Sequence, residues 1–300
     1  MIRLTAGCKV NLGLHVLGVR ADGYHELDSL FYPLPTPCDQ LDIRETGGQG
    51  IVVRCHEPCV NPERNTLTRA YAAFAREAGG APGIAAHLRK GIPSGSGLGG
   101  GSSDAASLLL WLNQRAGRPL DAAALARAAL AVGADAPFFL RNRPCRVQGV
   151  GEILTPTKHD FSGLTLVLVC PEIHVDTAWA FARYDALFPP AERIAAQNSL
   201  TKSPREANGT SLFGAGNGPW SAWDIRNDLE AAVFPSYPQL AAIKADLLRL
   251  GADAACMSGS GSSILGLFSR AAAAKAADAA RALRAEKRRV YLLPLGNTGM

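Results

Sequence analysis

Long apolar runs are missing from this chain of 300 residues. The strongest candidate, Leu164–Cys170, has seven residues and is interrupted by Thr165, whereas a helix that crosses a bilayer needs about 20. Near the start, Lys9 and Asn11 leave no room for the apolar region of a signal peptide. With 47% hydrophobic and 19% charged residues, the composition excludes disordered and fibrous proteins. We therefore expect a globular protein in the bacterial cytosol, without a membrane partner.

Cysteine offers neither a disulfide framework nor an obvious metal site. The seven cysteines are an odd number spread over the whole chain, which favours reduced thiols. Soft ligands lie closest together in Cys55-His56-Glu57-Pro58-Cys59, but no second Cys/His pair completes a tetrahedral zinc site. We interpret this segment as a loop and expect no metal-ligating cluster.

The net charge of the chain is also small, because 31 basic and 26 acidic residues give 31 − 26 = +5. The basic residues are scattered, except for the run from Arg284 to Arg289. This pattern disfavours a nucleic-acid partner and fits mild attraction for an anionic small molecule. We expect small-molecule partners and a monomer or weak homodimer.

Turn residues and periodicities predict an α+β protein with two domains, because strands and helices mix without strict βαβ alternation. A turn at residues 149–152 is followed by a new set of strands and helices. This change predicts a domain boundary near residue 155, and so domains 1–155 and 156–300. Residues 133–139 read as a loop in which Pro137 ends helical structure, and 198–223 as a long surface loop. The expected strands are 2–4, 10–19, 24–34, 84–88, 164–170, 264–268 and 290–295, and the expected helices are 66–77, 102–116, one after 121, 177–187, 227–232, 237–250 and 271–287.

Glycine is concentrated at one place, with five glycines in the seven positions from Gly95 to Gly101. Without side chains, the backbone N–H groups of such a stretch can turn toward one point, and a helix starting at Ser102 adds the positive end of its dipole. The pattern predicts a phosphate-binding loop. From the residues alone, the alternative is a flexible turn without a ligand.

Other nucleotide motifs fit this segment less well. Gly95 to Gly100 match G-x-G-x-x-G, but a dinucleotide fold needs a strand that runs into the first glycine and an acidic residue after the next strand. Here Pro93 precedes the loop and Asp121 begins a helix. Gly101 replaces the Walker A lysine, and protein-kinase H-R-D and D-F-G segments are missing. An oxidoreductase and a non-catalytic nucleotide-binding module remain as alternatives.

The glycine segment resembles the ATP-binding signature of the GHMP kinases, which include galactokinase, homoserine kinase and mevalonate kinase. Residues 93–106 read Pro-Ser-Gly-Ser-Gly-Leu-Gly-Gly-Gly-Ser-Ser-Asp-Ala-Ala. The Asp-Gly-Tyr-His-Glu segment at 22–26 resembles the GHMP kinases that act on 4-diphosphocytidyl-2-C-methyl-D-erythritol, and galactokinase and mevalonate kinase would not show it. The segments that resemble this branch are 9–14, 20–27, 133–139, 149–152, 227–230 and 257–261.

This resemblance implies an ATP-dependent kinase that phosphorylates the 2-hydroxyl of that acceptor in the non-mevalonate route to isoprenoid precursors, with ATP and Mg²⁺ as cofactors. It implies an N-terminal domain with a ribosomal protein S5 domain 2-like fold and a C-terminal ferredoxin-like sandwich. Lys9 and Asp135 would form the catalytic pair, in which the carboxylate takes the hydroxyl proton and the ammonium stabilises the alkoxide. From the residues alone, Lys9 also fits a surface lysine, and Asp253 competes with Asp135 because Gly-Ala-Asp-Ala occurs twice.

The resemblance also assigns binding residues. The cytosine of the acceptor would stack between Tyr24 and Phe181, with His25 at its polar edge, although Trp179 competes with Phe181. Ser102 or Ser103 would offer a hydroxyl to Mg²⁺. The implied acceptor residues are Asn11, Tyr24, His25, Asp135 and Phe181. The implied ATP residues are Asn65, which also fits a helix N-cap, and Pro93, Ser94, Gly95, Ser96, Gly97, Leu98, Gly99, Gly100, Gly101, Ser102 and Ser103.

Overall fold

The computed structural model describes residues 1–57, 61–157, 159–189, 225–286 and 288–296. Contacts between residues divide the chain into two compact units. Unit 1 comprises residues 1–9, 32–94 and 98–143, and unit 2 comprises residues 10–31, 95–97 and 144–300. Strands β1 (Ile2–Val19) and β2 (His25–Glu45), which pair, contribute residues to both units. Because the units interleave along the chain, they do not test the expected boundary near residue 155, which stays a prediction.

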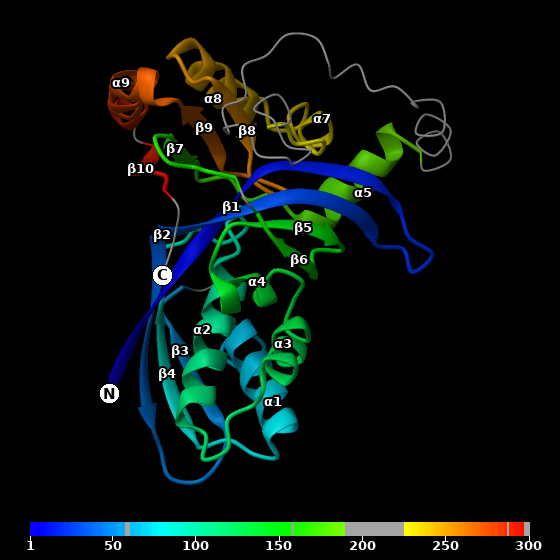
Figure 1. Ribbon diagram of the computed structural model, residues 1–300, viewed down its shortest axis with the longest axis vertical. Helices are drawn as coiled ribbons and strands as arrows, with labels where there is room; N and C mark the ends of the chain where they lie inside the picture. Colours follow the sequence, from blue (N-terminus) through cyan, green and yellow to red (C-terminus); the bar gives the residue numbers. More distant parts are fainter. Residues whose placement is uncertain (58–60, 158, 190–224, 287, 297–300) are drawn as a thin grey trace. The chain divides into compact units, whose positions relative to one another are not determined.

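Unit 1 is a sheet with helices on one face (Figure 1). Strand β4 (Ile84–Arg89) lies between β3 (Ile51–Cys55), which is parallel to it, and the second half of β2, which is antiparallel. Alternate strand residues enter the core, where they meet apolar residues of the helices. The helices are α1 (Thr66–Ala78), α2 (Gly100–Arg115), α3 (Ala122–Leu130) and α4 (Ala136–Arg141).

The helix starts of unit 1 follow local signals, with one correction. Asn65 caps α1 and Asp121 caps α3, as their side chains predict. The prediction that Pro137 ends helical structure is wrong, because Pro137 lies in the first turn of α4, where its missing N–H costs nothing. The segment at Cys55 also differs from the expected loop, since Cys55 ends strand β3.

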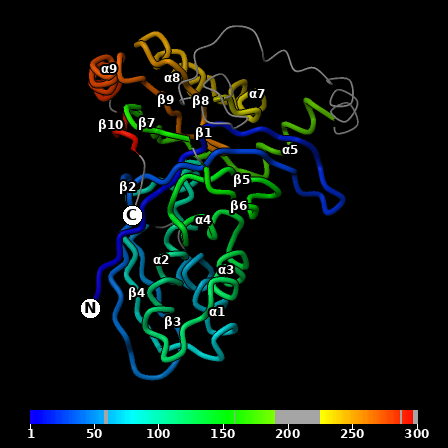
Figure 2. The backbone as a smooth tube through the Cα atoms, in the orientation of Figure 1, coloured from blue at the N-terminus to red at the C-terminus, as the bar shows by residue number. Residues whose placement is uncertain are grey.

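Unit 2 contains an antiparallel sheet of four strands in the order β10-β7-β9-β8. Along the chain, α5, α7 and α8 separate β7 from β8, and α9 separates β9 from β10. This is the β-α-β-β-α-β order of a ferredoxin-like fold, and α8 and α9 cover the sheet (Figure 2). The bounds are β7 (Thr165–Cys170), α5 (Thr177–Leu187), α7 (Glu230–Val233), α8 (Pro238–Arg249), β8 (Ala254–Met257), β9 (Ile264–Phe268), η2 (Arg270–Ala272), α9 (Ala273–Ala285) and β10 (Arg289–Pro294).

The first half of β2 adds a smaller part to unit 2. It pairs with β5 (Cys145–Gly149), which pairs in turn with β6 (Ile153–Pro156). The α+β class predicted from the sequence is confirmed by these elements. The expected loop at 198–223 lies outside the described residues. Within the described ranges, no helix has the length and apolar character that a membrane span requires.

Candidate active site

Lys9 and Asp135 lie together in unit 1. The Nζ atom of Lys9 is 3.4 Å from Oδ2 of Asp135. Lys9 lies on β1, where its N–H donates to the carbonyl of Leu98 (3.0 Å), and Asp135 directly precedes α4. The side chain of Lys9 is 4% exposed, which excludes a surface lysine, and that of Asp135 is 32% exposed. The pair therefore combines a buried cation with a carboxylate that a ligand can reach.

Asp253, the competing aspartate, forms hydrogen bonds with the backbone of unit 2. Its Oδ2 accepts a hydrogen bond from the N–H of Ser269 (2.6 Å), and its own N–H donates to the carbonyl of Leu267 (2.8 Å). These bonds stabilise the turns beside β8 and β9. The geometry of Asp253 is that of a turn residue.

The glycine loop needs glycine for both conformation and space. Gly97 and Gly99 have φ angles of 75° and 70°, in the left-handed region that side chains avoid. A Cβ at Gly99 would lie 3.1 Å from the ring of Phe139 and 3.3 Å from Cε of Lys9. The backbone of the loop therefore passes directly beside the lysine of the candidate pair.

Helix α2 begins at Gly100, within the glycine stretch and two residues before the expected start at Ser102. Gly99 is its N-cap residue, and among the described residues no side chain caps it. The N–H groups of the first turn have no carbonyl partners within the helix, and the positive end of the helix dipole lies there. Ser102 is partly exposed in this turn, whereas Ser103 is buried. Such an end is a ready site for phosphate oxygens.

A second glycine-containing motif, residues 257–263, holds the tip of the loop in unit 2. The hydroxyl of Ser258 donates to the carbonyl of Gly97 (3.1 Å) and accepts from the N–H of Asn11 (3.1 Å). The N–H of Ser263 donates to the carbonyl of Ser96 (3.1 Å). Residues 258 and 263 are thus hydrogen-bonded to residues 97 and 96 of the glycine loop.

The sequence analysis did not foresee what supports this second motif. Asn227 donates from Nδ2 to the carbonyls of Met257 (2.8 Å) and Gly259 (2.6 Å). Glu230 accepts from the N–H of Met257 (2.8 Å), and burial raises the pKa of this carboxyl against the opposing charge of Lys244. Asn227 and Glu230 lie in the segment 227–230 that resembles the kinase branch, but the resemblance assigned neither of them a role. Their sequence signal is a run of polar residues, Arg226 to Asp228 and Glu230, beside the apolar residues of 229–233.

Among the candidate acceptor residues of unit 2, Tyr24 is exposed, whereas His25 and Phe181 pack against each other. Tyr24 is 65% exposed. The rings of His25 and Phe181 lie with centroids 4.5 Å apart, tilted by 30°. Trp179 instead packs edge-on against Tyr237, at 5.6 Å and 89°. Of the two competing aromatics on α5, Phe181 is the one that the structure brings to His25.

Asp185, also on α5, was missed by the sequence analysis. Its Oδ1 and Oδ2 lie 2.9 and 3.1 Å from Nε2 of His25. The carboxylate therefore fixes the orientation of the His25 ring. Because 160 residues separate the two partners, no local pattern could reveal the contact.

Family models match the chain twice, as "GHMP kinases N terminal domain" over residues 65–143 and "GHMP kinases C terminal" over residues 211–285. The chain is 44% identical over 277 residues to the 4-diphosphocytidyl-2-C-methyl-D-erythritol kinase of Nitratidesulfovibrio vulgaris strain DP4, covering 92% of this chain and 93% of that one. The chain belongs to this kinase family. Its identity to the Solidesulfovibrio magneticus enzyme of the same name is 42%, covering 97% and 96% of the two chains.

A solved structure agrees with this kinase assignment. The crystal structure of a 4-(cytidine 5'-diphospho)-2C-methyl-D-erythritol kinase matches with a TM-score of 0.73 and 33% identity, covering 98% of this chain and 99% of that one. The predicted two-domain GHMP kinase architecture is thereby confirmed. The prediction that the protein is an ATP-dependent kinase is confirmed as well. The oxidoreductase alternative is excluded by this membership.

Asn65, expected near the nucleotide of this kinase, has its amide engaged locally. Its Oδ1 accepts from the N–H groups of Leu67 (2.9 Å) and Thr68 (3.0 Å). Its Nδ2 donates to the carbonyls of Asn61 (2.8 Å) and Pro62 (3.0 Å). These bonds are those of the N-cap interpretation, and a contact with the nucleotide stays a prediction.

Metal-binding side chains do not gather in the described part of this kinase. Among those residues, no three His, Cys, Asp or Glu side chains are placed to hold a metal ion. Cys59 of the sequence segment considered above lies outside the described residues. Within the described residues, no cysteine forms a disulfide. Any cation in the described part would thus depend on other ligands, such as hydroxyls and phosphate oxygens.

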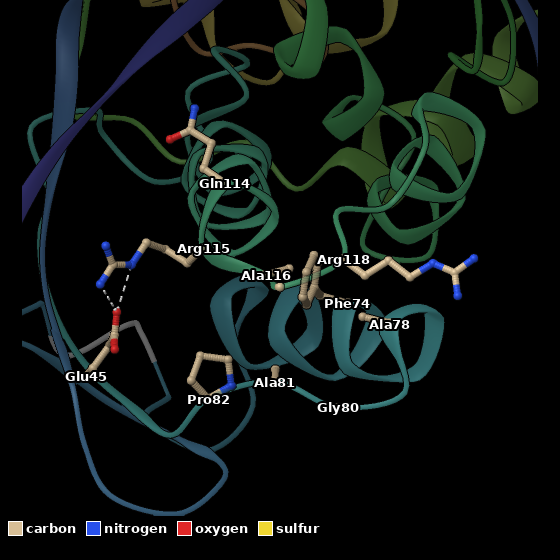
Figure 3. Close-up of a pocket in the computed structure, with 11 residues that line it drawn as sticks. Glu45, Phe74, Ala78, Gly80, Ala81, Pro82, Gln114, Arg115, Ala116 and Arg118 are labelled. Atoms are coloured by element: carbon tan, nitrogen blue, oxygen red, sulfur yellow. Dashed lines mark hydrogen bonds and ion pairs between the residues drawn. The ribbon is translucent and has the colours of Figure 1, made fainter.

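A pocket of about 520 Å³ lies elsewhere in unit 1, at the C-terminal end of α2. Figure 3 shows the ion pair of Glu45 and Arg115 at this pocket and the guanidinium of Arg118 directed away from that pair. The 16 residues of α2 place this end about 24 Å from the glycine loop. The pocket is therefore separate from the Lys9–Asp135 pair.

Proposed function

We propose that this kinase transfers the γ-phosphoryl group of ATP to the 2-hydroxyl of 4-diphosphocytidyl-2-C-methyl-D-erythritol and releases ADP. The observation that carries the proposal is the Lys9–Asp135 pair beside the turn at Gly99. The names of its relatives support the acceptor. A phosphate-binding loop next to an accessible carboxylate and a buried ammonium is what an alcohol-phosphorylating enzyme needs.

Asp135 acts as the general base in this proposal. Its carboxylate accepts the proton of the 2-hydroxyl while the hydroxyl oxygen bonds to the γ-phosphorus, and the bond from that phosphorus to the ADP oxygen breaks. Lys9, 3.4 Å from the carboxylate, stabilises negative charge on the attacking oxygen and orients Asp135. An aspartate is a weak base, but phosphoryl transfer depends mainly on positioning and charge neutralisation.

Residues 93–103 bind ATP in this proposal. The first-turn N–H groups of α2 fit the phosphate oxygens, because in the described structure no side chain caps that helix. Mg²⁺ would neutralise the phosphate charge when bound. We assign its hydroxyl ligand to Ser102, which is less buried than Ser103. Asn65 is placed near the nucleotide by the resemblance alone.

The cytidyl end of the acceptor fits the aromatic residues of unit 2. The exposed ring of Tyr24 offers one stacking face, and Phe181 offers the other. His25, held by Asp185, meets the polar edge of the base. Asn11 is buried, with its Nδ2 bonded to Ser29 Oγ (2.9 Å), so its assignment to the acceptor site follows from the resemblance.

The proposed enzyme acts on small molecules as a monomer or weak homodimer in the cytosol, without a nucleic acid. The scattered basic residues and the net charge of +5 support the absence of a nucleic-acid partner. Sedimentation equilibrium at micromolar concentration tests it. A stable larger oligomer would contradict the proposal for the assembly but not for the reaction.

Product identity is the decisive experiment. The protein is incubated with ATP, Mg²⁺ and 4-diphosphocytidyl-2-C-methyl-D-erythritol, and phosphorus NMR and mass spectrometry are expected to show the 2-phosphate and ADP. Homoserine, galactose and mevalonate serve as competing acceptors. Faster turnover of any of them would make the proposed acceptor wrong, and ATP binding without turnover would favour the non-catalytic module.

A further inference from the structure

Unit 1 contains a second group of lysine and aspartate side chains, and this one is sealed. Lys90 follows β4, and its side chain is 8% exposed, while those of Asp39 and Asp104 are 0% and 1% exposed. The ammonium donates to Oδ2 of Asp39 and to Oδ2 of Asp104, the latter at 3.0 Å. Charges so deeply buried persist only when they are paired.

The group joins three segments that meet at the glycine loop. Asp39 lies on β2, and its Oδ1 accepts from the N–H groups of Gly91 (2.7 Å) and Ile92 (2.8 Å), directly before the loop. Asp104 is the fifth residue of α2, directly after the loop. Lys90 therefore connects the backbone that enters the loop to the helix that leaves it.

Stability alone does not explain the second carboxylate. Lys90 with Asp39 would already be a neutral, hydrogen-bonded pair. Adding Asp104 brings an extra carboxyl group into the core, and in the described structure its Oδ1 is buried without a hydrogen-bond partner. Such an atom costs free energy. The carboxylate is better explained by the position that it gives to α2.

We propose that Lys90 and Asp104 are positioning residues for ATP, because their hydrogen bond fixes the first turn of α2 relative to the backbone that enters the glycine loop. The proposal rests on the proposed role of that loop as the ATP site. Neither side chain touches a phosphate. They act by holding the first-turn N–H groups of α2 in one orientation, and such preorganised donors bind an anion more tightly than mobile ones.

Asp104→Ala tests this most sharply, because it cuts the connection to α2 and leaves Lys90 and Asp39 as a neutral pair. Calorimetry with ATP and Mg²⁺, without acceptor, is expected to show a Kd raised about 10-fold, because ATP binding must then also order the first turn of α2. The resistance to urea should equal or exceed that of the wild type. Asp104→Asn, whose amide oxygen still accepts from Lys90, should restore the Kd to within about 3-fold. The KM for the acceptor should stay unchanged in both variants.

Arg115→Ala is the matched control at the other end of α2, where the exposed pair with Glu45 (2.6 Å) is lost. It should leave the Kd for ATP unchanged. The proposal is wrong if Asp104→Ala binds ATP like the wild type, if Asp104→Asn loses as much affinity as Asp104→Ala, or if Asp104→Ala does not fold. Since ATP binding is measured without acceptor, failure of the proposed acceptor would appear separately, as absent turnover by the wild type.

Discussion

The two lysine–aspartate groups of unit 1 contain the same residue types in opposite surroundings. Asp135 is 32% exposed beside the buried Lys9, whereas Asp39 and Asp104 are closed off from solvent around Lys90. An accessible carboxylate can meet a hydroxyl, but an enclosed one can only hold parts of the protein. Burial by itself would lower the pKa of Lys90, yet the charges of Asp104 and Asp39 raise it. Solvent access, more than residue type, separates chemistry from positioning.

Asp135→Asn should produce the largest effect, because it keeps the shape of the accessible group and removes its proton acceptor. We expect kcat to fall about 10²- to 10⁴-fold, the usual contribution of a general base, with little change in ATP binding. Steady-state kinetics at saturating ATP and acceptor measure this. Asp253→Asn is the control, since Asp253 bonds a turn. Near-normal kcat in Asp135→Asn together with lost turnover in Asp253→Asn would show that the wrong aspartate was chosen.

Lys9→Met should slow turnover somewhat less, by roughly 10²-fold, because it removes one electrostatic contact with the developing alkoxide. The double variant with Asp135→Asn should lose far less than the product of the two single losses, since residues that act as a unit are not additive. Single-turnover rates of the four proteins provide the measurement. Multiplicative losses would mean that Lys9 and Asp135 act independently.

The sequence predicted those features that depend on neighbouring residues along the chain. Asn65 and Asp121 cap helices, α5 begins and ends where expected, and the glycine loop precedes α2. The sealed group could not be predicted in this way. Asp104 reads as one more helix residue, and its role follows only from Lys90, 14 positions away, and from Asp39, which lies 51 positions before Lys90. Such contacts are set by tertiary packing.

Short strands escaped prediction for a related reason. Strand β8 has four residues and β3 has five, too few to show a clear alternation, and each is defined by its partner strand. Strand β3 pairs with β4, about 30 positions away along the chain, and β8 pairs with β9 across the second glycine motif. Hydrogen bonding between strands depends on these partners more than on the strand's own sequence.

Tyr24→Ala and Phe181→Ala extend the contrast between open and packed residues to unit 2. Each substitution should weaken binding of the cytidyl acceptor by about 1–3 kcal/mol, because base stacking is lost. The KM for the acceptor should therefore rise, and the KM for ATP should stay unchanged. Tyr24→Ala should keep the wild-type Tm because Tyr24 is 65% exposed, whereas Phe181→Ala should lower Tm because Phe181 packs on His25 and the core. Trp179→Ala, the control, should lower Tm without raising either KM. Equal changes in both KM values would remove these rings from the cytosine site.

Asp104→Asn should give the smallest effect, and it appears in the pH dependence of stability. Burial raises the pKa of Asp104 from 3.8 to about 7, although Lys90 opposes the shift. Between these values the folded protein keeps a proton that the unfolded chain has lost, so the free energy of unfolding should decrease as pH rises toward 7. The Asn variant cannot titrate, and relative to the wild type it should gain about 1–2 kcal/mol between pH 5 and pH 7. Urea unfolding at pH 5, 6, 7 and 8 measures both proteins. Parallel stability curves would mean that Asp104 holds the same protonation state in the folded and the unfolded chain, and the contrast between a sealed and an accessible carboxylate would then lose its electrostatic basis.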